Sequence, residues 1–340
     1  MSFDLQVTVD GRSLVPARTG IGVHTAEIAG RLDVSVPPVI ASHAGITNRQ
    51  GIEHCRFRVD PAPNGILWQQ FVLPDIVKEG VLWGPFGTIP MTLRVPAVVT
   101  LHDFSSITMP GRHRLKTLAS FNLFIGRSLE RARRVAAVSR AVAEEAVRWF
   151  GVARPKIEIV PNGVDEFFQP GGDEGDFILF VGTLEPRKGT DVLFAAWWSL
   201  PEPRPPLIVC GDPGWGVRMP DGVQTTGWVD RGRLRSLYQR ARVFVYPSRY
   251  EGFGIPPLEA MACGTPVIAT RTGAIAEYAA DAALLIDPGD PRALREAMLR
   301  LLRDPSLRRD LRARGLERAR HYRWERSARL MTDLLAEAAR

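Results

Sequence analysis

Short apolar runs alternate along the chain with longer stretches that show helical periodicity. The runs are rich in Val and Ile, and several are continuously apolar, which is typical of parallel strands buried on both faces. Strands are predicted at Leu5–Val9, Val36–Ala41, Cys55–Val59, Val81–Trp83, Ala97–Leu101, Val135–Val138, Ile157–Val160, Phe177–Val181, Leu207–Cys210, Val223–Thr226, Val243–Tyr246, Pro266–Thr270 and Ala283–Ile286.

The stretches between these runs carry apolar residues at helical spacing. Helices are predicted at Val23–Leu32, Arg114–Arg133, Arg140–Phe150, Thr190–Ser199, Arg231–Arg240, Pro257–Ala262 and Pro291–Arg303. Strand and helix therefore alternate through both halves of the chain. This order predicts an α/β fold with two Rossmann-like domains, each built on a parallel sheet.

The boundary between the halves is predicted at Phe168–Gly175, which is rich in Pro, Gly and acidic residues and has no periodicity. The domains are then 1–168 and 173–322, followed by an amphipathic helix at about 323–340. Because open α/β sheets bind ligands at the carboxyl ends of their strands, two such domains would face each other across a deep cleft.

Composition narrows the functional class only slightly. The 340 residues are 45% hydrophobic and 24% charged, as in ordinary globular proteins, and suit two domains. No apolar run approaches the roughly 18 residues of a membrane helix, and the N-terminus has no apolar block typical of a signal peptide. Three scattered cysteines suit a reducing cytoplasm.

The net charge of +7 favours an anionic ligand or an anionic membrane surface, but an Arg-rich composition alone would also produce it. Nucleic-acid binding would rest on charge alone, because no basic-aromatic patch or recognition helix accompanies it. The Arg-rich stretch Arg300–Arg329 has its charges at helical spacing and is predicted to be a solvated helix face.

Two segments of the second half carry candidate chemistry. In the first, Gly182 ends a predicted strand, and Arg187 and Lys188 follow shortly before a helix. Two cations at that strand end can hold a diphosphate, Arg through its fork and Lys as a point charge. The alternative is a solvated basic turn.

The second segment, Glu251–Glu259, follows another predicted strand. Its glycines allow a close backbone approach to a ligand, and Pro257 suits the first position of a helix. Glu259 would then lie in the first helical turn, where the helix dipole favours a carboxylate and free amides can bind phosphate. Two carboxylates beside such a helix end suit a sugar, a ribose and a phosphate.

These segments together resemble the family-4 retaining glycosyltransferases of the GT-B fold. The resemblance rests on Glu251 and Glu259 in the spacing E-x₇-E, with Gly-Phe-Gly between them. It continues through Met261–Ala269, Pro161–Asp165, Val181–Gly189 and Thr226–Val229. In the first half it is limited to Thr19–Gly22 and Leu101–Asp103.

The resemblance implies roles for individual residues. Arg187 and Lys188 would hold the donor diphosphate, and Glu251 would contact the sugar hydroxyls. The remaining donor contacts would come from the backbone of Val229, the segment Gly252, Phe253, Gly254 and Ile255, the ribose-binding Glu259, the sugar-facing His102, and Gly20, Gly22 and Gly182 near the diphosphate.

The resemblance also implies a reaction. The anionic leaving group would be stabilised by the two cations and the helix end, so we expect no metal and no cofactor. Asp287–Asp290 is interpreted as the turn that begins a helix, not as a metal-binding pair. Retention would proceed by front-face attack. A double displacement needs two carboxyl groups about 5–5.5 Å apart across the sugar, whereas Glu259 is expected to reach the ribose instead.

Donor and acceptor are less specified by the sequence. The chain beginning, with Val9–Arg12 and Thr19–Gly22, resembles mannosyltransferases of cell-surface polysaccharide pathways, which suggests GDP-mannose, with UDP-sugars as the alternative. The acceptor would be a glycan or a lipid-linked sugar.

Phe104–Ala119 is basic and partly apolar, with Phe104, Ile107, Met109, Leu115 and Leu118 among Arg112, His113, Arg114 and Lys116. It could lie on a membrane or form an ordinary acceptor loop. The remaining alternatives are a nucleotide-sugar epimerase, a phosphorylase and a non-catalytic nucleotide-sugar-binding module. The last helix is expected to pack on the first domain.

Overall fold

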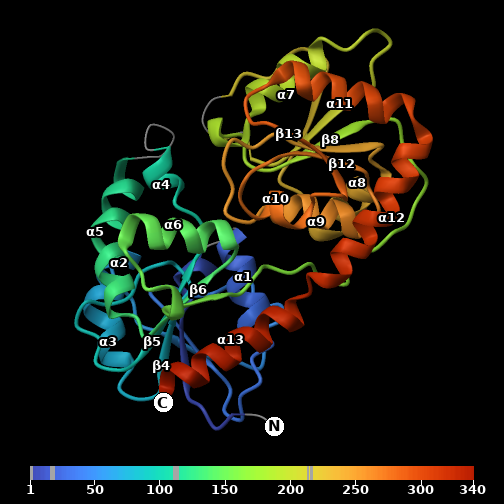
Figure 1. Cartoon of the computed structure of the whole chain (residues 1–340). Helices are drawn as coiled ribbons and strands as arrows, with labels where there is room; N and C mark the ends of the chain where they lie inside the picture. Colours follow the sequence, from blue (N-terminus) through green and yellow to red (C-terminus); the bar gives the residue numbers. More distant parts are fainter. Residues whose placement is uncertain (1–2, 16–19, 110–114, 213, 215–216) are drawn as a thin grey trace. The chain divides into compact units, whose positions relative to one another are not determined.

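The computed structural model describes residues 3–15, 20–109, 115–212, 214 and 217–340, without the side chains of 115–122. The chain forms two compact units, shown in Figure 1. The first comprises Met1–Gly163 and Trp324–Arg340, and the second comprises Val164–Arg323.

The first unit contains a parallel sheet in the order β3-β2-β1-β4-β5-β6-β7. Every run predicted as a strand in this half forms one, with ends shifted by a few residues. The strands are β1 Val7–Asp10, β2 Val39–Ser42, β3 Arg56–Val59, β4 Val81–Gly84, β5 Ala97–Leu101, β6 Arg134–Ala137 and β7 Ile157–Ile159. The order reverses between β1 and β4, so the switch point, where ligands bind in such sheets, lies there.

Helices cover both faces of this sheet (Figure 1): α5 and α6 lie on one side, and α1 and α13 on the other. The helices are α1 Gly20–Ala29, α2 Gly65–Leu67, a π-helix Trp68–Val72, α3 Leu73–Ile76, α4 Ser105–Thr108, α5 Leu115–Arg131, α6 Arg140–Phe150 and α13 Trp324–Ala339. Helix α6 has the predicted bounds because Ser139 caps its first turn and Gly151 ends it in the left-handed conformation.

The second unit contains a parallel sheet in the order β10-β9-β8-β11-β12-β13, with its switch point between β8 and β11. All predicted strands are again present. They are β8 Ile178–Val181, β9 Leu207–Cys210, β10 Val223–Gly227, β11 Val243–Tyr246, β12 Val267–Thr270 and β13 Ala283–Ile286.

In Figure 1, α7 and α11 cover one face of this second sheet, and α8, α9 and α10 cover the other. The helices are α7 Thr190–Trp198, α8 Arg231–Arg240, α9 Ile255–Ala262, α10 Gly273–Tyr278, α11 Pro291–Arg303 and α12 Pro305–His321. The Asp290 carboxylate accepts from the backbone N–H groups of Arg292 and Ala293, which confirms that Asp287–Asp290 leads into a helix.

The break between the units lies after Gly163, earlier than the linker predicted at Phe168–Gly175. Phe168 is buried and packs against Tyr238, and Asp165 forms an ion pair with Arg231 at 2.7 Å. These contacts attach residues 164–168 to the second unit. The composition of this stretch indicated turns, but it did not indicate that Phe168 packs in the core of the second unit.

Candidate active site

Charged side chains from two different loops meet at the switch point of the second sheet. Lys188 lies in the turn after β8, and its Nζ donates to Glu251 Oε1 at 2.7 Å and to the Tyr246 hydroxyl at 2.6 Å. Arg187 Nη1 lies 3.4 Å from the same Glu251 oxygen. The structure therefore brings together Arg187, Lys188 and Glu251, three residues that the sequence selected from segments far apart.

The backbone fixes the two loops against each other. Gly189 has φ +66°, and a Cβ there would lie 2.1 Å from the carbonyl oxygen of Pro247. Gly273 has φ +49°, and its Cβ would lie 1.8 Å from the Glu251 carbonyl oxygen. Both contacts exclude a side chain, so Gly189 permits the turn that carries Lys188 to approach the loop after β11, and Gly273 permits the turn after β12 to approach Glu251.

Glu251 is ionised although it is buried. Burial by itself raises the pKa of Glu251, which is 7% exposed, but Lys188 and Arg187 outweigh it and hold this pKa at about 2. Burial lowers the pKa of Lys188, and the Glu251 carboxylate opposes that change. Burial, followed by Glu251, raises the pKa of Tyr246 well above its ordinary value, so its hydroxyl stays neutral.

Arg187 is also fixed from the other side. Its Nη2 donates to Glu185 Oε1 at 2.6 Å, and its Nη1 donates to the Tyr250 carbonyl at 3.2 Å. Sequence reasoning missed Glu185 and Tyr246, although both lie within a few residues of the selected motifs. The cluster thus holds two cations in place with two carboxylates, at the strand ends where the fold places ligands.

The segment after Glu251 offers backbone more than side chains. Phe253 is buried, with its ring 5.4 Å from that of Tyr278 and 6.0 Å from that of Tyr322. Its side chain therefore belongs to the core, and its amide is the part that a donor could reach. Gly252 is buried, and Gly254 precedes Ile255, the first residue of α9.

The expected position of Glu259 in the first helical turn is wrong, because α9 begins at Ile255 and not at Pro257. Glu259 lies in the second turn, where the helix dipole contributes less. Its Oε2 instead accepts a hydrogen bond from the Tyr238 hydroxyl at 2.9 Å, a partner that sequence reasoning missed.

Two further candidates lie near the ends of β10 and β8, which are separated by β9 in the sheet. Val229 is half-buried between β10 and α8. Gly182 directly follows β8, and a Cβ there would lie 4.0 Å from Lys188 Cε.

In the first unit, His102 directly follows β5. Its Nε2 lies 2.9 Å from the Pro85 carbonyl oxygen, and since that oxygen can only accept, Nε2 carries the proton. Burial lowers the pKa of His102 to about 4, against the opposing effects of Asp103 and of this hydrogen bond. The imidazole is therefore neutral at physiological pH, with Nδ1 as a hydrogen-bond acceptor.

Gly20 and Gly22 were expected in a loop, but they form the first turn of α1, which begins three residues before the predicted Val23. Gly20 is exposed and Gly22 is buried. The helical pattern extends further toward the N-terminus than the apolar residues indicated. Thr19 lies outside the described residues.

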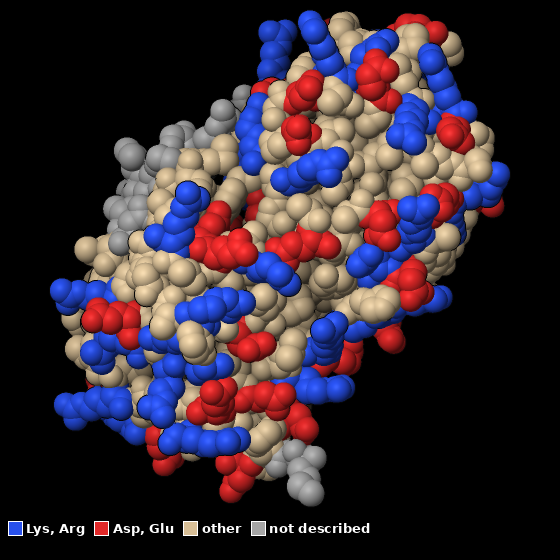
Figure 2. Space-filling view, in the orientation of Figure 1, with Lys and Arg blue, Asp and Glu red and all other residues tan. Residues whose placement is uncertain are grey.

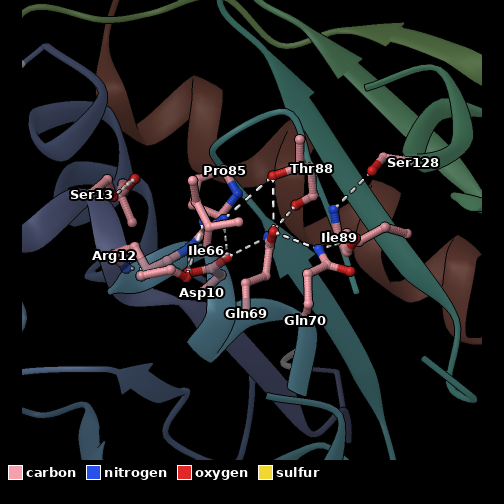
Figure 3. A network of polar contacts seen from close by, with 12 residues as sticks. Asp10, Arg12, Ser13, Ile66, Gln69, Gln70, Pro85, Thr88, Ile89 and Ser128 are labelled. Carbon is pink, nitrogen blue, oxygen red and sulfur yellow. Dashed lines mark hydrogen bonds and ion pairs between the residues drawn. The ribbon is translucent and has the colours of Figure 1, made fainter. Parts of the chain in front are cut away.

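A second polar network lies at the end of β1 (Figure 3). Asp10 is fully buried and accepts from Arg12 Nε at 2.9 Å, Arg12 Nη2 at 2.8 Å and Gln69 Nε2 at 2.9 Å. Gln69 continues to the Thr88 carbonyl at 2.8 Å. The network joins β1 to the π-helix and to the segment after β4.

The basic and apolar stretch after His102 is only partly described. Phe104, expected on its surface, is instead buried against Trp149 and Phe150. Arg112, His113 and Arg114 lie outside the described residues, as do the side chains of Leu115, Lys116 and Leu118.

Within the described ranges, no helix is long and apolar enough to cross a membrane. Among those same residues, no group of three or more His, Cys, Asp or Glu side chains could hold a metal ion. Figure 2 shows basic and acidic side chains interspersed over the visible surface, so the excess positive charge forms no single basic face in this view.

The fold and the second-unit cluster define a two-domain enzyme of the GT-B architecture. Sucrose-phosphate synthase from Thermosynechococcus elongatus is 22% identical, with a TM-score of 0.77 and 98% of each chain covered. Anabaena HepE in complex with UDP-glucose is 18% identical, with a TM-score of 0.80 over 98% of this chain and all of that one. These similarities establish the fold.

The sequence matches two family models, Glycosyltransferase Family 4 over residues 19–166 and Glycosyl transferases group 1 over 165–318. The O-antigen chain mannosyltransferase B of Escherichia coli is 33% identical over 285 residues, which are 76% of this chain and 74% of that protein. A D-inositol 3-phosphate glycosyltransferase of Xylanimonas cellulosilytica is 32% identical over 60% of this chain and 57% of its own length.

The chain therefore belongs to glycosyltransferase family 4 and is a glycosyltransferase. The family match includes the first half, where the sequence analysis found only isolated motifs. The epimerase, phosphorylase and non-catalytic alternatives lose their support.

Proposed function

We propose that this enzyme transfers mannose from GDP-mannose to a glycan or lipid-linked acceptor, with retention of anomeric configuration and without a metal ion. The observation that carries this proposal is the cluster of Arg187, Lys188 and Glu251. Its two cations are largely buried and both contact the same Glu251 oxygen, which suits the diphosphate of an activated sugar.

The cations would act mainly on the leaving group. Negative charge develops on the diphosphate as the glycosidic bond breaks, and preorganised donors in a water-poor site stabilise such charge strongly. Lys188 and Arg187 are already oriented by Glu251 and Glu185, so little reorganisation is needed. This supply of positive charge supports a reaction that needs no metal.

The acidic residues favour front-face attack over a double displacement. A nucleophilic carboxylate needs an accessible oxygen, whereas Oε1 of Glu251 is held by Lys188, and Glu259 accepts from Tyr238. In the proposed reaction Glu251 contacts the sugar hydroxyls and Glu259 contacts the ribose. The acceptor hydroxyl attacks the anomeric carbon as the carbon–phosphate oxygen bond breaks, and the departing phosphate takes the acceptor's proton.

The donor proposal rests on the relatives. The Escherichia coli mannosyltransferase supports a mannosyl donor, and the Anabaena structure with UDP-glucose keeps UDP-sugars as the alternative. Thermal unfolding with GDP-mannose, UDP-glucose and ADP-glucose separates them, because a ligand of the native state raises its apparent stability. A shift with UDP-glucose and none with GDP-mannose would overturn the donor assignment.

Transfer and metal independence are tested together by a reaction in excess EDTA. It uses the nucleotide sugar that raises the thermal stability of the enzyme and a panel of glycan acceptors. We expect unchanged turnover in EDTA and an α-linked product from an α-linked donor by NMR. Loss of turnover in EDTA, restored by Mg²⁺ or Mn²⁺, would contradict metal independence.

We also propose a cytoplasmic location, which the three buried, unpaired cysteines support because disulfides are rare in that reducing compartment. Contact with the inner membrane surface is a further proposal, based on the basic sequence of residues 104–119. Flotation with anionic vesicles tests it. Absence of salt-sensitive binding would exclude it.

A further inference from the structure

His102 does not stand alone at the end of β5. The ring of His24, from α1, lies 4.6 Å from the His102 ring between centroids, at an interplanar angle of 89°. His24 is fully buried, with the rings of Trp83 and Trp324 at 5.9 and 6.0 Å. Two tryptophan rings thus pack around His24, and the third ring that it contacts is the imidazole expected to face the donor sugar.

His24 is itself anchored by a polar contact. Its Nδ1 lies 2.7 Å from Oδ1 of Asn162, which follows β7. The contact joins α1 to the carboxyl end of the sheet across 138 positions of sequence. It fixes the plane of the His24 ring, and therefore also the surface against which His102 rests.

Packing alone does not explain a histidine at this position. His24 Nε2 is buried and has no hydrogen-bond partner, which is unfavourable for a polar atom. Burial, and then His102, lower the pKa of His24 well below its ordinary value, so the side chain is neutral. A phenyl ring would fill the same space without an unsatisfied nitrogen, but it could not bind Asn162.

We propose that His24 is a positioning residue for His102: together with Asn162 it fixes the plane of the His102 imidazole, so that Nε2–H stays on the Pro85 carbonyl and Nδ1 is presented as an acceptor to a hydroxyl of the donor sugar. The positioning rests on the geometry of the first unit alone. The sugar contact rests on the proposed function.

The arrangement explains why two attachments are needed. The Pro85 hydrogen bond fixes one ring atom of His102, but rotation about the Cβ–Cγ bond could still break it and turn the other nitrogen toward the sugar. The perpendicular ring of His24 opposes that rotation. His24 also lies one helical turn after Gly20, so the same residue links α1, whose first turn is expected near the diphosphate, to His102.

The first experiment is ¹⁵N-resolved NMR of the histidine side chains in the full chain, with His102 assigned from the spectrum of His102→Gln. Wild type should show a neutral His102 protonated at Nε2 between pH 6 and 8. His24→Ala should show mixed tautomers or a broadened signal. An unchanged His102 signal in folded His24→Ala would overturn the proposal.

The second experiment measures turnover and nucleotide binding for His24→Ala, His24→Phe and Asn162→Ala. A misplaced contact at the reacting sugar can lower the rate by about 10²-fold. We expect a fall of that order in kcat for His24→Ala, with the affinity for the nucleoside diphosphate unchanged because that ligand lacks the transferred sugar. His24→Phe, which keeps a perpendicular ring but loses Asn162, should fall between.

His43→Ala is the matched control. His43 is a half-buried histidine of the first unit whose buried Nδ1 also has no hydrogen-bond partner. It contacts Trp68 rather than His102. Its replacement should leave both the His102 signal and kcat unchanged. Full activity in both His24→Phe and Asn162→Ala would contradict the role of the Asn162 anchor. This test does not depend on whether His24→Ala folds.

The outcomes also separate this inference from the proposed function. A changed His102 signal with unchanged kcat would support the positioning and refute the sugar contact of His102. Absence of any nucleotide binding in wild type would refute the proposed donor class and leave the NMR test intact.

Discussion

Each unit contains a buried carboxylate at the switch point of its sheet, and the two are built differently. Asp10 ends β1, and its main partner, Arg12, lies two positions away in the same turn. Glu251 follows β11, and its partner Lys188 lies 63 positions away in another loop. One ion pair is local, whereas the other exists only when two loops meet.

The difference indicates two roles. Asp10 accepts from both Arg12 and Gln69, and Figure 3 shows these contacts continuing to Thr88, so its oxygens are used to join segments of the first unit. Glu251 instead orients two cations that a ligand can use. We infer that Asp10 acts on stability and that Glu251 acts on activity, and four predictions test this contrast.

The largest effect is expected for the second-unit cluster. Lys188→Ala and Glu251→Ala should each lower transfer by about 10²–10³-fold, the effect typical of removing a single preorganised charge-stabilising group. Each should also destabilise the unit, because removal of one partner leaves the other buried without its main countercharge. Turnover and urea unfolding measure the two effects.

The double variant Lys188→Met/Glu251→Gln separates them. It removes both charges at similar volume, so stability should recover toward wild type while transfer stays lost. Near-wild-type turnover in Lys188→Ala would refute the assignment of Lys188 to the diphosphate.

The first-unit pair should show the opposite pattern. Asp10→Asn leaves Arg12 without its carboxylate and should lower the free energy of unfolding by about 3–5 kcal/mol. Nucleotide affinity, measured by calorimetry at a temperature where the variant is folded, should not change. If Asp10→Asn weakened nucleotide binding tenfold while stability stayed the same, the contrast would be wrong.

Much of the fold could be predicted because most strands and helices are specified by residues within the element itself. Short apolar runs, several of them continuous, predicted every strand of both sheets, and side-chain caps at Ser139, Asp230 and Asp290 begin helices with the predicted bounds. Residues 65–76 were missed. An Asn64 cap begins the first of their three short helical pieces, and buried contacts of Gln69 and Gln70 hold the stretch in place.

The site was only partly predictable for the same reason. Arg187, Lys188 and Glu251 belong to recognisable motifs, but their partners do not. Tyr246 is 58 positions from Lys188, and a strand-ending tyrosine has no distinctive sequence context. His24 appeared to be an ordinary helix residue, because the contacts with His102 and Asn162 arise only when the sheet brings distant strand ends together.

Acid should affect the Glu251 cluster in a defined range. The pKa of Glu251 in the folded chain is about 2, below its ordinary value of 4.5. A carboxyl group whose pKa is lowered by folding stabilises the native state above its ordinary pKa, and this contribution is lost as the pH falls toward the folded value. It amounts to about 3 kcal/mol at neutral pH.

Urea unfolding of wild type and Glu251→Gln between pH 7 and 2 measures this contribution. The difference in unfolding free energy should be constant above about pH 5 and should shrink between about pH 4.5 and 2. A difference that grows in acid would have the wrong sign and would show that Glu251 is protonated in the native state.

The smallest effect is expected for Tyr238→Phe, which removes the hydrogen bond to Glu259 and leaves the ring in the core. A net hydrogen bond is worth about 0.5–1.5 kcal/mol, or roughly a twofold to tenfold change in binding. Nucleoside diphosphate affinity should fall by that factor because Glu259 loses a hydrogen bond that would orient it for the proposed ribose contact. The 2′-deoxynucleotide lacks one of the hydroxyls that Glu259 is proposed to bind, so its affinity should change less between wild type and Tyr238→Phe. An equal loss for both nucleotides would mean that Tyr238 supports α9 in general and that Glu259, like Asp10, is a structural carboxylate.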